Sequence, residues 1–111
     1  MFYEMRLKPE PFDRIVAGTK KIEFRLWDEK RQLINQGDQI IFTNTYTGKT
    51  ISTCVEEMYL ASSFEKLKEV LIKKNLIEET DFEPSAMLKY YSREEEEKYG
   101  VVGIEVKLLS N

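Results

Sequence analysis

Residues 18–25, Gly-Thr-Lys-Lys-Ile-Glu-Phe-Arg, hold the densest group of side chains that could do chemistry in this chain. Arginine offers a rigid fork of donors and lysine a mobile charge, which suits recognition of phosphate or carboxylate. A glutamate between them can hold the arginine or accept a hydrogen bond from a nucleobase amine. Two interpretations of Lys20, Lys21, Glu23 and Arg25 therefore stay open. They either neutralise one another on a solvated strand face, or they orient an anionic ligand.

The residue types that are missing restrict the chemistry further. The chain has no histidine, which removes the commonest general base and metal ligand. Its single cysteine, Cys54, can neither form an internal disulfide nor build a structural zinc site. The sequence therefore predicts no metal site and no cofactor, and any catalysis would use lysine, carboxylate, hydroxyl or phenol groups.

The charge is acidic overall but uneven along the chain. The net charge is −3, which argues against a strongly basic nucleic-acid domain. Residues 1–55 hold nine basic and seven acidic side chains, whereas residues 56–111 hold eight basic and thirteen acidic ones. The basic excess lies in the half with the charged motif, and a local positive patch of this kind fits a small anionic ligand better than a long duplex.

Length and composition predict one domain over residues 1–111 with its own core, because 41% of the 111 residues are hydrophobic. No apolar run is long enough to span a membrane, so we expect no membrane association. The alternating start of the chain lacks the apolar segment of a signal peptide. Together with the single cysteine, these features lead us to expect a cytoplasmic protein.

A predicted strand positions the charged motif. From Lys20 to Trp27, apolar Ile22, Phe24 and Leu26 alternate with Glu23, Arg25 and Trp27, as in a half-buried strand. A short helix with Pro11 in its first turn precedes it, and Gly18 is expected to end that helix in a left-handed conformation.

The remaining elements predict an α+β domain with a mainly antiparallel sheet, able to close into a small barrel and flanked by helices. The expected strands are 3–8, 39–43, 49–59 and 101–109. One helix is expected over 64–74 with Ser62 as its cap, and another over 93–99 capped by Ser92 and Glu95. Between them, a helix is expected to begin at Pro84 and to have Met87, Leu88 and Tyr91 on its inner face. The acidic run Glu94–Glu97 is typical of a solvated helix face. Trp27, Tyr90 and Tyr91 offer stacking surfaces for a base, although tyrosines are more often core or rim residues.

A family resemblance bears on the open alternatives. Residues 18–25 resemble the Gly-x-Lys-x-x-Glu-x-Arg signature of the ASCH domain family, part of the PUA-like superfamily. Residues 36–42 and 99–106 are similar to the family's second conserved strand and its closing strand. The resemblance implies a PUA-like barrel flanked by helices, with a cleft lined by Lys20, Glu23 and Arg25. The expected ligand of this cleft is RNA, a nucleoside or a nucleotide, with Lys21, Trp27, Tyr90 and Tyr91 as further contacts.

One branch of that family removes the acyl group from N4-acetylcytidine with a lysine and a threonine of the motif and with a second glutamate, which lies further along the chain. Lys20 matches the lysine, but Glu23 occupies the threonine position. Glu78, Glu79 and Glu83 are the candidates for the second glutamate. The resemblance therefore implies a binding module first, and a small amidohydrolase with Lys20 and Glu23 as catalytic residues as the alternative. A third interpretation is a charged face that meets a protein partner or no ligand.

Overall fold

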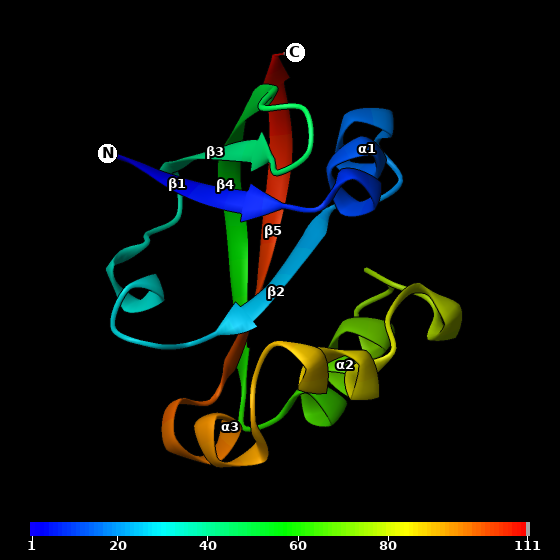
Figure 1. Cartoon of the computed structure of the whole chain (residues 1–111). Helices are drawn as coiled ribbons and strands as arrows, with labels where there is room; N and C mark the ends of the chain where they lie inside the picture. Colours follow the sequence, from blue (N-terminus) through cyan, green and yellow to red (C-terminus); the bar gives the residue numbers. More distant parts are fainter. Residues whose placement is uncertain (111) are drawn as a thin grey trace. The chain divides into compact units, whose positions relative to one another are not determined.

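The computed structural model describes residues 1–110, and their side chains as far as Leu109. The strands are β1 (Phe2–Leu7), β2 (Ile22–Leu26), β3 (Gln39–Asn44), β4 (Thr50–Ala61) and β5 (Val101–Ser110), and the α-helices are α1 (Pro9–Ala17), α2 (Phe64–Lys73) and α3 (Arg93–Tyr99) (Figure 1). Short 3₁₀ helices occupy Arg31–Leu33, Glu79–Asp81 and Pro84–Lys89. The strands form one sheet in the order β1-β3-β4-β5-β2.

The sheet is mixed. β1 pairs in parallel with β3, from Phe2 opposite Gln39 to Leu7 opposite Asn44, and the two lie side by side in Figure 1. β3 then pairs in antiparallel fashion with β4 through a short hairpin. Since a parallel pair needs a crossover connection, α1, β2 and the following loop all lie between β1 and β3 in the chain.

The chain divides into two compact units, each assembled from separate stretches. The first comprises residues 1–23, 34–58 and the segment that begins at Ile104. Its core contains the fully buried side chains of Ile40, Phe42, Thr53, Val55 and Ile104. A single domain over residues 1–111 stays a prediction, and its last residue lies outside the described part.

The second unit comprises residues 24–33 and 59–103. Its core is aromatic: the rings of Phe24 and Phe82 stack at 3.7 Å between centroids, and Phe64 meets Phe82 edge-on at 6.1 Å. The apolar stripe of α2 completes this core, because Leu67 and Leu71 are fully buried. Helix α2 is therefore held by tertiary packing of one face, as an amphipathic helix requires.

Helix α1 ends where the sequence predicts. Gly18 has a φ of 80°, and its N–H reaches the carbonyls of Arg14 and Ile15. The helix begins at Pro9, and Pro11 lies in its first turn as predicted. Proline at the first helical position loses no intrahelical hydrogen bond, so two prolines two residues apart both fit the first turn.

Two expected helices differ in the structure. Ser63, not Ser62, caps α2, and its side chain accepts a hydrogen bond from the Lys66 N–H at 3.2 Å. The segment from Pro84 forms a 3₁₀ helix instead of an α-helix. Leu88 is 47% exposed rather than inside, whereas Met87 and Tyr91 are half-buried.

Helix α3 and its cap are as predicted. The Ser92 side chain accepts from the Glu95 N–H at 3.1 Å, while the Glu95 carboxylate accepts from the Ser92 N–H at 2.9 Å. These reciprocal bonds satisfy two donors at the start of the helix.

Candidate functional site

Strand β2 carries the charged motif and has the predicted parity. Ile22, Phe24 and Leu26 are all buried, so the apolar face of the strand points into the protein. Each end of the strand is fixed by a backbone hydrogen bond: the Val106 N–H donates to the Lys21 carbonyl at 2.8 Å, and the Trp27 N–H donates to the Gly100 carbonyl at 3.0 Å. The charged side chains therefore project from an ordered backbone.

Lys20 and Glu23 form an ion pair at the start of β2. The Lys20 Nζ lies 3.5 Å from Glu23 Oε1, and only 13% and 8% of the two side chains are exposed. Of the two open interpretations of this strand face, a solvated face does not fit Glu23, which is buried. A buried charge is costly without a partner, and at this position each charge has the other nearby.

The structure places the other two charged residues of the motif differently. Lys21 is exposed next to the ion pair, within the first unit. Arg25 is half-buried and lies in the part of β2 that belongs to the second unit, which begins at Phe24. All four residues of the motif thus lie on β2 or within two residues of its start.

The three aromatic candidates belong to the second unit and have different surroundings. Trp27 is half-buried, and its carbonyl accepts a hydrogen bond from Gln32 Nε2 at 2.8 Å. The Tyr91 ring lies nearly parallel to the buried Phe64 ring, with centroids 6.0 Å apart. Tyr90 is 55% exposed. Tyr91 therefore packs on the core of its unit, whereas Tyr90 offers its ring to the solvent.

The candidates for a second glutamate have local roles in the structure. Glu79 forms an ion pair with Lys68, with Oε1 and Nζ 3.0 Å apart, and Glu83 Oε1 accepts a hydrogen bond from the Ser85 hydroxyl at 3.4 Å. All three glutamates are exposed and lie in the second unit. Glu79 therefore joins its segment to α2, and the contact of Glu83 stays within its own turn.

Sequence reasoning missed two buried charges. Lys68 on α2 is 9% exposed and Glu96 on α3 only 4% exposed. The prediction of a solvated face for residues 94–97 holds for three of the four glutamates but is wrong for Glu96. The other charged side chains of these two helices are exposed, and no feature of the neighbouring sequence sets Lys68 and Glu96 apart from them.

Two features that bear on function are absent from the described part of the chain. Within residues 1–110 there is no group of three or more cysteine, aspartate or glutamate side chains arranged to hold a metal ion. None of the helices in that part has both the length and the apolar character that crossing a membrane requires.

The comparisons with known proteins identify the class. The ASCH domain model matches residues 5–110, so the chain belongs to the ASCH domain family. It is similar to the crystal structure of the hypothetical protein PH0355, with 38% identity, a TM-score of 0.79, and coverage of 98% of this chain and 100% of that one. Protein PF0455 from Pyrococcus furiosus, solved by NMR in solution, is 35% identical with a TM-score of 0.74, and both chains are covered completely.

A more distant structure supports the fold alone. The S128A variant of ZmASCH from Zymomonas mobilis is 17% identical, with a TM-score of 0.64, and the match covers 94% of this chain and 66% of that one. No curated protein sequence matches the chain. The predicted α+β, PUA-like fold with flanking helices is confirmed.

Proposed function

We propose that this ASCH-domain protein binds RNA or a nucleotide-like ligand at the ion pair of Lys20 and Glu23. Lys21 and Arg25 supply further positive charge from the same strand. Three aromatic residues, Trp27, Tyr90 and Tyr91, are the candidates for stacking on a base.

The observation that carries the proposal is the burial of the ion pair. A pair with only 13% and 8% of its side chains exposed adds little stability, because the cost of desolvation offsets the attraction. Such a pair suits ligand recognition better. An ammonium group has three N–H donors and can bind Glu23 and a phosphate or base oxygen together, while the glutamate fixes its position.

The residues around the pair have roles that follow from their chemistry. Lys21, being exposed, is placed to meet a phosphate as a point charge. Arg25 can bind a phosphate or a base edge with two parallel hydrogen bonds. Glu23 either holds Lys20 or accepts from an exocyclic amine of the base.

Binding measurements at several salt concentrations test the proposal. We expect a labelled single-stranded RNA pool to bind at low salt, and Arg25→Ala and Lys21→Ala each to weaken that binding. If either residue contacts a phosphate, its loss lowers the salt slope by about 0.7. The matched control is Lys73→Ala, which removes an exposed lysine from α2. Absence of binding to RNA, nucleosides and nucleotides at low salt would refute the proposal.

Amidohydrolysis of an acylated nucleoside is the second candidate, and one observation favours it: a largely buried lysine lies beside a carboxylate, an arrangement that can move a proton. The same carboxylate, however, stabilises the charged ammonium form, whereas a base needs the neutral amine. Incubation with N4-acetylcytidine decides this point. Turnover that disappears in Lys20→Ala supports hydrolysis, and no turnover above that variant excludes this substrate.

A further inference from the structure

The tip of the β3–β4 hairpin, residues 44–49, is a fixed turn. Every backbone N–H of these six residues has an acceptor. Three of these N–H groups donate to backbone carbonyls: residue 44 to Lys49, residue 45 to Leu7 and residue 48 to Asn44. The N–H groups of residues 46 and 47 donate to the Asn44 side chain, and that of residue 49 donates to the Thr47 hydroxyl. A loop whose donors are all satisfied within the protein has little freedom to rearrange.

A buried side chain sets the shape of this turn. Asn44 is only 3% exposed, and its Oδ1 accepts from the N–H groups of Tyr46 and Thr47 at 2.8 and 3.2 Å. The Thr45 N–H donates to the Leu7 carbonyl at 2.8 Å, which joins the tip to the end of β1. The tip is thus anchored from inside by an asparagine and from the side by the neighbouring strand.

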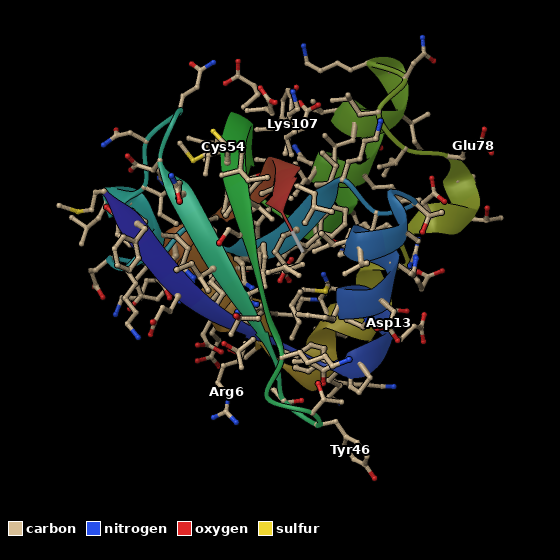
Figure 2. All side chains as sticks on the ribbon, turned by 90° about the horizontal axis from the view of Figure 1, so that it is seen from above. Arg6, Asp13, Tyr46, Cys54, Glu78 and Lys107 are labelled. Carbon is tan, nitrogen blue, oxygen red and sulfur yellow. The ribbon has the colours of Figure 1, made fainter. Side chains whose placement is uncertain are left out.

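This turn holds one large aromatic ring in the solvent. Tyr46 is 87% exposed, and Figure 2 shows its side chain pointing away from the ribbon at the end of the hairpin. A single exposed aromatic residue is not unusual by itself. A ring on a preorganised turn, however, loses little entropy when a partner stacks on it.

The hairpin that carries the ring is positively charged, which favours an anionic partner. The hairpin from Gln39 to Val55 contains Lys49 and no acidic residue, although the chain has 20 aspartates and glutamates. β1 adds Arg6, which pairs with Thr43 close to the tip. In Figure 2 the Arg6 side chain projects on the same side of the molecule as Tyr46.

We propose that Arg6, Tyr46 and Lys49, here called the Tyr46 tip, form a second contact surface for single-stranded RNA. Tyr46 stacks on an unpaired base, and the two cations meet the adjacent phosphates. Single strands fit because the bases of a duplex are already stacked on each other and hide their faces. The proposal rests on RNA as the ligand of this protein, but its residues are separate from the Lys20–Glu23 pair.

Titrations with two ligands test the Tyr46 tip: a single-stranded RNA of about ten nucleotides, which is a typical site size, and a mononucleotide. Tyr46→Ala is expected to weaken RNA binding about fivefold or more, since base stacking contributes at least about one kcal/mol. Tyr46→Phe keeps the ring and should bind within about twofold of wild type, because stacking needs no hydroxyl. Mononucleotide binding at the ion pair should not change in either variant.

Phe2→Ala is the matched control, because Phe2 is an exposed aromatic residue at the other end of β1, opposite Gln39. Cross-linking of bound RNA by ultraviolet light should place the RNA on the 44–49 peptide. The inference is overturned if Tyr46→Ala binds RNA as tightly as the wild-type protein, which would leave a protein partner as the occupant of the tip. It is also overturned if the wild-type protein binds no RNA. If Tyr46→Ala weakens RNA binding while Arg25→Ala does not, the Tyr46 tip is supported as an RNA contact and the proposed site at the Lys20–Glu23 pair is refuted.

Discussion

Glu96 Oε1 accepts a hydrogen bond at 3.0 Å from the backbone N–H of Phe64, which lies 32 residues earlier in the chain. Phe64 is the first residue of α2, so a carboxylate from α3 satisfies one of the donors that an α-helix leaves unpaired at its start. The negative charge also suits the helix dipole there. The second oxygen, Oε2, lies 3.2 Å from Arg93 Nη1. Glu96 therefore links the two helices of the second unit.

Replacing Glu96 tests this link. Glu96→Ala leaves a buried N–H without its acceptor, and we expect the free energy of unfolding to fall by about 1–3 kcal/mol. Glu96→Gln keeps an acceptor oxygen and should cost less. Urea denaturation measures both, with Glu94→Ala, an exposed neighbour on α3, expected to change stability by less than about 0.5 kcal/mol. Equal stabilities of the Glu94 and Glu96 alanine variants would contradict the role of the link.

Gly100 has a conformation that only glycine adopts readily. Its φ is 73° and its ψ is −173°, and a Cβ added there would lie 3.1 Å from the Ala61 carbonyl oxygen. Gly100→Ala should therefore destabilise the protein by about 3 kcal/mol or more, because the strain and the close approach add. Gly18→Ala is the matched comparison: φ is 80° there, but nothing lies within 4 Å, so about 1 kcal/mol is expected. Thermal unfolding of the two variants should rank them in this order, and the reverse order would show that the approach to Ala61 is unimportant.

The parts of the fold that sequence predicted are those in which a local pattern decides the structure. Ile22, Phe24 and Leu26 alternate, and the strand buries all three. Gly18 ends α1 because no other residue adopts its left-handed conformation so readily. The cap of α2 was harder to predict, because Ser62 and Ser63 are adjacent and either serine could cap the helix. The spacing of Ser62 and Glu65 favours Ser62, whereas in the structure Ser63 accepts the capping hydrogen bond.

The rest depends on distant parts of the chain. Glu96 looks like its three acidic neighbours, and only the start of α2 makes it a buried acceptor. The candidate site was found from residue types and the family signature, yet the burial of the Lys20–Glu23 pair could not be read from spacing. The sequence did not predict a role for Tyr46, because a tyrosine in a turn is informative only once its exposure and the surrounding hydrogen bonds are known.

The pH dependence of stability should include a contribution from Glu65. The hydrogen bond from Arg93, whose Nη1 lies 2.7 Å from Glu65 Oε2, holds the pKa of this carboxyl below its usual value. A lowered folded-state pKa means that the stabilisation is present above the unfolded-state pKa and disappears as the pH falls through the folded-state pKa. We therefore expect Glu65→Gln to be slightly less stable than wild type at neutral pH and equally stable in acid.

The difference between Glu65→Gln and wild type should be small, because both side chains of the pair are about half exposed to water. It should also shrink in about 1 M salt, where charges are screened within about 3 Å. Chemical denaturation at several pH values, with and without salt, provides the measurement. A difference that grows as the pH falls would show that the ion pair with Arg93 is not its source.

A double-mutant cycle on Lys20 and Glu23 separates stability from binding. Glu23→Leu leaves a largely buried ammonium without its carboxylate, and Lys20→Met leaves the carboxylate without its ammonium. Each single change is expected to lower the free energy of unfolding by about 3 kcal/mol. Replacing both residues, Lys20→Met with Glu23→Leu, should recover much of that loss, because an apolar pair needs no desolvated charge. Each single variant should therefore be less stable than the double variant, which is the sign of a coupled pair.

The apolar double variant is the decisive protein for the proposed site. It should fold with nearly wild-type stability but bind RNA or nucleotide much more weakly, because its ligand groups are gone. Lys73→Ala, which removes an exposed charge from α2, is the control and should leave binding unchanged and stability within about 0.5 kcal/mol of wild type. If the folded double variant binds its ligand as tightly as wild type, the ion pair serves the fold rather than recognition.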